Sequence, residues 1–256
     1  MKGLIAAGGN ATRLAELTRV TNKHLLPVGS WPMVYYPLQL LQRVGVTEIL
    51  IVTGQQHAGQ FIDLLGDGRV RARNGDELIF DVSLTYKVQT EAGGIAQVVG
   101  MARDFAGGDQ LVVCLGDNIF EQAQADAIRD WTDGALVFVK DVPDPENFGV
   151  VAYGDNGEVA DIVEKAGVVD LRYDAPPSND AIVGLYCYPP DVFDIIDGLA
   201  PSNRGELEIT DVNRVYAQSG RLDVRRVEGW WHDGGKHWAD LADVGRRVEE
   251  TGVNRV

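Results

Sequence analysis

The sequence has few cysteines, few basic residues and no long apolar run. Only two of its 256 residues are cysteines, Cys114 and Cys187, and both lie in apolar segments, so buried thiols in a reducing compartment are expected. Lys and Arg total 23 against 38 Asp and Glu, and the net charge of −15 gives no general attraction for nucleic acid or anionic lipid. No stretch approaches the roughly 18 apolar residues of a membrane span. The apolar start 1–7 is too short for a secretory signal. We therefore expect a cytoplasmic protein with no nucleic-acid or membrane partner.

Two common nucleotide-binding signatures are also missing. Gly8-Gly9 follows the first apolar run, but it continues neither as G-x-G-x-x-G nor to the Gly-Lys-Ser/Thr of a P-loop. Adjacent glycines let backbone N–H groups approach a phosphate, and Arg13 and Lys23 can add positive charge. Taken alone, the segment is equally an ordinary turn after a strand. A dinucleotide-dependent oxidoreductase is disfavoured because its glycine pattern is absent.

Apolar runs and helical spacing alternate along the first half of the chain. Strands are predicted at 4–7, 48–53, 79–88 and 110–115, and helices at 33–44, 61–65 and 95–105. This order predicts an α/β fold with a Rossmann-like, mainly parallel sheet flanked by helices. The less regular second half predicts a β extension on the substrate side. Its expected strands are 135–140, 149–153, 159–164 and 181–188, its expected helices are 192–199, 209–218 and 237–250, and a loop is expected at 166–180.

No change in composition divides the chain, so a single domain over 1–256 is expected. Ligands of parallel α/β sheets bind at the carboxyl ends of the strands. Segments that follow four predicted strands are therefore candidates for one crevice: 8–13, 53–56, 89–97 and Asp117.

A series of motifs, in order along nearly the whole chain, resembles the sugar-1-phosphate nucleotidylyltransferase family. The family's G-G-x-G-T-R-L and K-x-L-L-P-V are matched by Gly8-Gly-Asn-Ala-Thr-Arg-Leu14 and Lys23-His-Leu-Leu-Pro-Val28. Further matches are Tyr86-Lys-Val-Gln89, Gly93-Gly-Ile-Ala-Gln97, Leu115-Gly-Asp-Asn-Ile-Phe120, Phe148-Gly-Val-Val151, Glu164-Lys165, Arg204-Gly-Glu-Leu-Glu-Ile-Thr-Asp211 and Trp231-His-Asp-Gly-Gly235. The set is most similar to the thymidylyltransferases that act on glucose 1-phosphate.

The resemblance implies a reaction of dTTP with a sugar 1-phosphate, most of all glucose 1-phosphate, that gives a dTDP-sugar and pyrophosphate with Mg²⁺. It implies that 1–120 mainly bind the nucleotide and 121–256 mainly the sugar, and that the protein is a homo-oligomer. The roles that it carries over are catalytic for Arg13, Lys23, Asp117 and Lys165, nucleotide-binding for Gly8, Gly9, Thr12, Gln89 and Gly94, sugar-phosphate-binding for Gly149, Glu164, Lys165 and Arg204, and Mg²⁺-binding for Asp117 and Asp233.

Some features depart from the family pattern. Ala11 replaces a loop glycine, where a positive φ costs more, and Ala166 stands where proline usually follows the Glu-Lys pair. The chain also resembles a short form of the family, in which feedback control by a downstream sugar nucleotide is not expected.

Two alternative functions stay open. One is a UTP-dependent enzyme, because one methyl group discriminates by only about 1–3 kcal/mol. The other is a non-catalytic protein that binds a sugar nucleotide.

Overall fold

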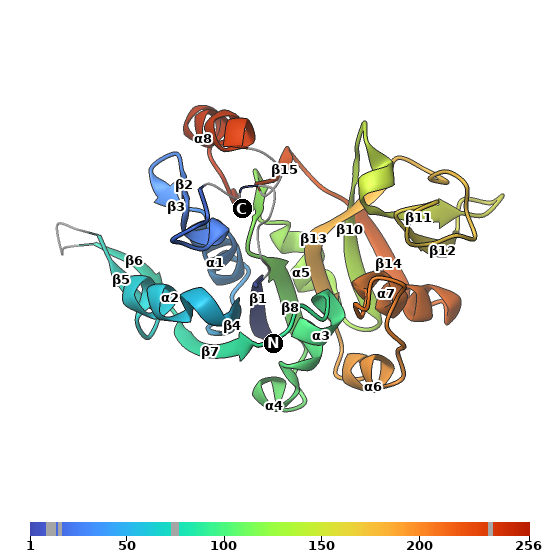
Figure 1. Cartoon of the computed structure of the whole chain (residues 1–256), viewed down its shortest axis with the longest axis horizontal. Helices are drawn as coiled ribbons and strands as arrows, with labels where there is room; N and C mark the ends of the chain where they lie inside the picture. The colour runs from blue at the N-terminus through green and yellow to red at the C-terminus, as the bar shows by residue number, and fades with distance from the viewer. Residues whose placement is uncertain (9–13, 15–16, 73–76, 235–237) are drawn as a thin grey trace. The chain divides into compact units, whose positions relative to one another are not determined.

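The computed structural model describes residues 1–8, 14, 17–72, 77–234 and 238–256, and its chain divides into two compact units, most of whose strands and helices are labelled in Figure 1. The first unit contains Met1–Ala92, Val112–Arg129 and Glu228–Val256, and the second contains Gly93–Leu111 and Asp130–Val227. Each unit is described by itself.

Four strands of the first unit follow one another in the order β8–β1–β4–β7. They are β1 (Lys2–Ala7), β4 (Glu48–Gly54), β7 (Ser83–Gln89) and β8 (Leu111–Leu115). β4 runs parallel to both β1 and β7, with Thr53 opposite Ala7 on one side and Val88 on the other. The Gly116 N–H donates to the Ala6 carbonyl at 2.9 Å. The predicted parallel strands are confirmed, and their carboxyl ends meet at one edge.

Helices and short strand pairs complete the first unit. The helices are α1 (Tyr35–Arg43), α2 (Ala58–Leu65), α5 (Ala125–Asp130) and α8 (Trp238–Thr251), with 3-10 turns η2 (Lys23–Leu25) and η3 (Gln55–His57). The paired strands are β2 (Pro27–Val28) with β3 (Trp31–Pro32), β5 (Arg69–Arg71) with β6 (Leu78–Asp81), and β9 (Asn118–Phe120) with β15 (Trp231–Asp233). Helix α8 packs against β2, where Val28, Met33 and Val244 share a buried cluster.

The second unit contains a mixed set of strands in the order β12–β11–β13–β10–β14. They are β10 (Ala135–Asp141), β11 (Gly149–Tyr153), β12 (Val159–Glu164), β13 (Asp180–Tyr188) and β14 (Leu222–Arg226). β10 is antiparallel to β13 and parallel to β14. The helices are α3 (Ile95–Gly100), α4 (Arg103–Ala106), α6 (Val192–Asp197) and α7 (Ile209–Gln218), with the 3-10 turn η4 (Pro145–Asn147). The predicted β extension and the α/β fold are confirmed.

Two predicted elements are each divided in the structure. The strand expected at 79–88 is β6 followed by β7, because the chain changes partners at Val82, whose N–H donates to the Gly68 carbonyl at 3.3 Å. The helix expected at 95–105 ends at Gly100 and begins again at Arg103 as α4. Both cysteines are buried and not disulfide-bonded, as predicted. Among the described residues, no helix has the length and apolar character needed to cross a membrane.

Candidate active site

Two of the predicted nucleotide-binding residues meet at the carboxyl edge of the first unit's strands. Gly8 follows β1, and Gln89 is the last residue of β7. A Cβ at Gly8 would lie 2.8 Å from Gln89 Oε1 and 4.0 Å from the Gly54 nitrogen. Glycine at position 8 therefore leaves room for the Gln89 amide. Gly9, Thr12 and Arg13 lie outside the described residues.

Lys23 and Asp117 form a largely buried ion pair in the same unit. Lys23 Nζ donates to Asp117 Oδ2, and the two side chains are only 16% and 13% exposed. The other carboxylate oxygen accepts from Asn118 Nδ2 at 2.9 Å. Burial alone would raise the pKa of Asp117, but the charge of Lys23 and these hydrogen bonds lower it to about 2. Asp117 is therefore ionised at neutral pH.

His24 is a neighbour of this pair that the sequence did not single out. The imidazole is 2% exposed, and its Nδ1 lies 2.6 Å from Asn22 Oδ1. Burial, and then the charge of Lys23, lower the pKa of His24 to about 3, so the ring is neutral at neutral pH. A Cβ at Gly116 would lie 2.6 Å from His24 Cδ2. In the sequence, the one indication that His24 is buried near Lys23 was its position between Lys23 and the apolar run that follows.

Asp233 comes beside Asp117 through the pairing of β9 with β15. Asp233 lies opposite Asn118 in this antiparallel ladder, and the Gly234 N–H donates to the Asp117 carbonyl at 2.8 Å. In the part of the chain that the structure describes, no group of three or more His, Cys, Asp or Glu side chains could hold a metal. Mg²⁺ commonly takes one or two carboxylates and completes its shell with water and substrate phosphates. An ionised Asp117 with a second carboxylate on the next strand fits that donor set.

The predicted sugar residues of the second unit gather around Glu164, the last residue of β12. Glu164 lies opposite Gly149 in the β11–β12 ladder, and Thr210 Oγ1 donates to Glu164 Oε2. A Cβ at Gly149 would lie 2.8 Å from Thr210 Oγ1 and 3.1 Å from Glu164 Oε2. Gly149 is therefore needed for the Thr210–Glu164 contact, which the sequence did not predict.

Two cations flank Glu164. Lys165 Nζ lies 3.4 Å and Arg204 Nη2 lies 3.8 Å from Glu164 Oε1. Arg204 Nη2 also donates to both Glu208 oxygens at 2.9 Å, and it lies 3.4 Å from Glu206. The structure thus brings Glu164, Lys165 and Arg204 together, with Arg204 engaged by carboxylates.

Gly94 has a packing role in the second unit. Its φ is +91°, and a Cβ there would lie 2.3 Å from the Leu207 carbonyl oxygen. The Leu207 N–H donates to the Gly93 carbonyl at 2.8 Å, and the Ala96 N–H donates to the Leu207 carbonyl at 3.2 Å. These bonds join the 93–97 segment to the segment that carries Arg204.

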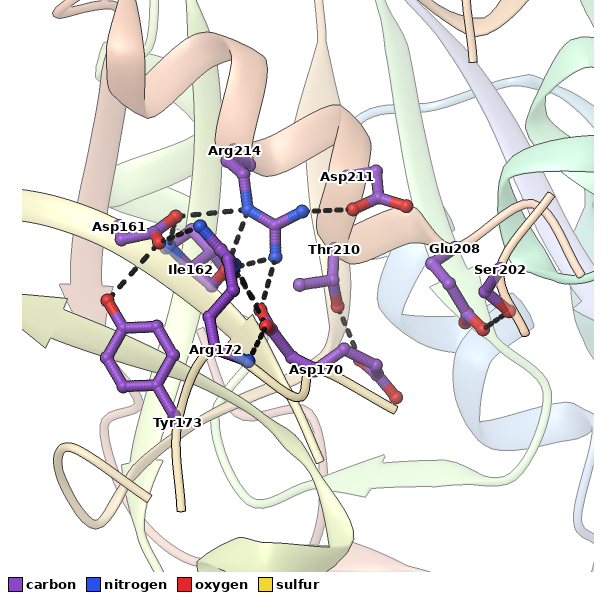
Figure 2. Close-up of polar contacts among 11 residues, drawn as sticks. Asp161, Ile162, Asp170, Arg172, Tyr173, Ser202, Glu208, Thr210, Asp211 and Arg214 are labelled. Atoms are coloured by element: carbon purple, nitrogen blue, oxygen red, sulfur yellow. Dashed lines mark hydrogen bonds and ion pairs between the residues drawn. The ribbon is translucent and has the colours of Figure 1, made fainter. Parts of the chain in front are cut away.

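A polar cluster behind Glu164 was also missed by sequence reasoning. Figure 2 shows Arg214 of α7 facing the carboxylates of Asp161 and Asp170, with Arg172 beside them. Arg214 lies one helical turn after Thr210, so both reach the same strand end from one face of α7. The sequence signal was this spacing within α7.

Comparison with known proteins identifies the family. The family model described as Nucleotidyl transferase matches residues 2–251, so the chain belongs to the nucleotidyl transferase family, as the motifs predicted. A glucose-1-phosphate thymidylyltransferase from Neisseria meningitidis is 40% identical over 93% of this chain and 79% of its own length. A low-salt glycan biosynthesis nucleotidyltransferase, Agl11 of Haloferax volcanii, is 37% identical over 98% of this chain, which spans 66% of that protein's length.

A solved structure supports the same family. The crystal structure of a Bacillus anthracis protein, described as a glucose-1-phosphate thymidylyltransferase in complex with sucrose, matches with a TM-score of 0.85 and 41% identity. The match covers 98% of this chain and 96% of that one. The predicted Rossmann-like fold is therefore found in a relative as well as in this chain.

Proposed function

We propose that this protein transfers the thymidylyl group of dTTP to glucose 1-phosphate and releases pyrophosphate, with Mg²⁺ as cofactor. The observation that carries the proposal is the Lys23–Asp117 pair with Asp233 on the neighbouring strand. It supplies one cation and two carboxylates, with Lys23 and Asp117 largely buried and Asp233 partly exposed, which suits a polyphosphate and its metal ion. The name of the Neisseria relative supports the choice of substrates.

The proposed reaction needs positioning and charge neutralisation rather than a covalent protein intermediate. An oxygen of the sugar phosphate attacks the α-phosphorus of dTTP in line, and the bond to the β-phosphate breaks. Lys23 binds phosphate oxygens near the reacting centre, and Arg13 holds the departing pyrophosphate. Asp117 and Asp233 would hold Mg²⁺, which when bound neutralises phosphate charge.

The remaining predicted residues select the substrates. The Gln89 amide can donate and accept hydrogen bonds, as the polar edge of thymine requires. Gly8, Gly9, Thr12 and Gly94 complete the nucleotide site in this proposal. Glu164 and Gly149 bind the sugar, and Lys165 and Arg204 bind its phosphate through charge-assisted hydrogen bonds. We also propose that 1–120 mainly serve the nucleotide and 121–256 the sugar, within a homo-oligomer.

The test is pyrophosphate release with purified protein, glucose 1-phosphate, Mg²⁺ and either dTTP or UTP. We expect turnover with dTTP that EDTA abolishes and excess Mg²⁺ restores. If kcat/KM is higher with UTP than with dTTP, the proposed nucleotide substrate becomes UTP. Binding of dTTP by calorimetry without turnover, across several sugar 1-phosphates, would show a binding protein instead of an enzyme.

A further inference from the structure

The turn that carries Lys165 has an unusual backbone conformation. Lys165 has a φ of +41°, in the left-handed region that residues with side chains rarely adopt. Its N–H donates to the Phe148 carbonyl at 3.0 Å, and its own carbonyl accepts from the Val168 and Val169 N–H groups at 2.9 and 3.0 Å. Such strain persists only where the surrounding structure fixes it.

Arg214 holds the chain on both sides of this turn. Before the turn, the Ile162 carbonyl accepts from Arg214 Nη2 at 2.7 Å and from Nε at 3.1 Å. After the turn, Arg214 Nη2 donates to Asp170 Oδ2 at 2.9 Å, and the Asp170 N–H donates to the Glu164 carbonyl at 2.9 Å. Figure 2 shows the Ile162 and Asp170 contacts of Arg214 meeting at its guanidinium.

A second arginine, Arg172, adds positive charge to the cluster, in which Arg214 Nη1 also donates to Asp211 Oδ1. Arg172 Nε donates to Asp170 Oδ1, and Arg172 Nη1 lies beside Asp161 Oδ2, both at 2.9 Å. Arg214 Nε donates to the other oxygen of Asp161 at 3.0 Å. Asp161 and Asp170 are buried and each contacts both arginines, so loss of one guanidinium leaves a single cation between two buried carboxylates.

The same helix also fixes the Glu164 side chain. Thr210 Oγ1 donates to Glu164 Oε2, and Arg214 follows one turn later on α7. We propose that Arg214 is a positioning residue for the sugar 1-phosphate: it holds Lys165 in its left-handed turn by binding Ile162 and Asp170. This inference rests on the proposed function of Glu164 and Lys165.

The kinetic test compares Arg214→Met with Arg221→Met. Arg221 follows α7 and pairs with Asp191 and Asp133 at 2.6 and 3.0 Å, so its loss removes two carboxylate partners, whereas the loss of Arg214 removes three, Asp161, Asp170 and Asp211. We expect Arg214→Met to lower kcat/KM for glucose 1-phosphate by about ten- to a hundredfold, with the KM for dTTP within about twofold. Arg221→Met should leave both parameters within about twofold. Equal losses toward both substrates in Arg214→Met would overturn the proposal.

Two further variants test whether the charge of Asp170 and the donor geometry of Arg214 are both required. Asp170→Asn preserves shape and the backbone bond to Glu164 but removes the charge that Arg214 binds, so we expect the same selective loss in a folded protein. Arg214→Lys keeps a positive charge but loses the planar set of guanidinium N–H donors. Its kcat/KM for glucose 1-phosphate should therefore lie between those of Arg214→Met and the wild type. Wild-type kinetics toward glucose 1-phosphate in Asp170→Asn would overturn the proposal.

Hydrogen exchange tests the turn without any substrate. The Val168, Val169 and Asp170 amides, which donate to Lys165 and Glu164 carbonyls, should exchange at least about tenfold faster in Arg214→Met than in Arg221→Met. Equal protection in both variants would overturn the positioning role. If the wild type lacks turnover but this difference appears, the proposed function fails while the structural role of Arg214 stands.

Discussion

At the scale of single residues, the Lys23–Asp117 pair places two opposite charges where water has little access. Removing one partner of a buried pair leaves the other charge uncompensated, which costs about 3–5 kcal/mol when burial is complete. Both side chains here keep some exposure, so a smaller cost is expected. Under the proposed function, stability and substrate binding therefore depend on the same two side chains.

Replacing either carboxylate of this site should stop the reaction while the fold persists. We expect Asp117→Asn and Asp233→Asn each to lower kcat by at least about a hundredfold, because an anionic metal ligand is lost. Asp117→Asn should also lower the free energy of unfolding by about 1–3 kcal/mol. Steady-state kinetics and urea unfolding measure both effects, with Asp126→Asn at the exposed start of α5 as control. Near-normal kcat at low millimolar Mg²⁺ would refute the metal assignment.

The buried imidazole of His24 makes stability depend on pH. Its pKa of about 3 in the folded state lies below 6.5, the value expected when unfolded, so the unfolded chain binds the extra proton between these values. Stability should be complete above about pH 6.5 and fall with acidification, by about 2 kcal/mol between pH 7.5 and 5 from this residue. Urea unfolding of wild type and His24→Gln measures the difference, and His57→Gln on η3 is the control. An unchanged slope in His24→Gln would contradict the assignment.

The proposed contact of the Gln89 amide with the base can be tested by the kinetics toward dTTP. Gln89→Ala should raise the KM for dTTP and lower kcat/KM by about one order of magnitude, because the polar edge of the base loses its partner. The KM for glucose 1-phosphate should change less. Steady-state kinetics with each substrate varied in turn make the comparison, and an unchanged kcat/KM for dTTP would exclude Gln89 as the base reader.

At the scale of elements, helix α8 meets the β2–β3 turn at two glycines. A Cβ at Gly245 would lie 2.7 Å from the Gly29 nitrogen, which is backbone and cannot rotate away. Alanine normally stabilises a helix by about 1 kcal/mol relative to glycine, but here overpacking of about 1–3 kcal/mol opposes that gain. The close packing of α8 on this turn therefore requires Gly245.

A matched pair of substitutions separates the two effects. Gly245→Ala should lower the free energy of unfolding by up to about 2 kcal/mol, whereas Gly59→Ala in α2, whose Cβ position has no heavy atom within 4 Å outside its chain neighbours and its own helix backbone, should raise it by about 0.5–1 kcal/mol. Urea unfolding of both variants measures the difference. Stabilisation by Gly245→Ala would show that the turn moves aside at no cost.

The main strands and helices could be predicted because apolar periodicity reports which faces are buried. The break at Val82 was not predictable, because inward and outward residues keep alternating through it while the hydrogen-bond partner changes. Family motifs indicated Glu164 and Lys165, but not Arg214, whose partners Asp161 and Asp170 are distant in sequence and separated by a loop. Contacts of this kind depend on tertiary packing.

At the scale of the whole molecule, neither compact unit is a continuous piece of chain. The chain passes between the units at 92/93, 111/112, 129/130 and 227/228. Each unit therefore consists of separate chain segments that are joined through the other unit. If one unit unfolds, the segments of the other lose the connections that keep their ends together. We expect a single cooperative transition, with calorimetric and van't Hoff enthalpies in a ratio near 1. Two separate transitions in calorimetry would contradict the single domain that the sequence predicts.

Two hydrogen bonds, from the Leu207 N–H to the Gly93 carbonyl and from the Ala96 N–H to the Leu207 carbonyl, have a thermodynamic consequence under the proposed function. They tie the segment expected to meet the nucleotide to the segment that carries Arg204. A ligand that orders one of these segments lowers the entropy that the other must still lose on binding. Linkage makes this effect reciprocal, so each substrate should tighten the equilibrium binding of the other by the same factor.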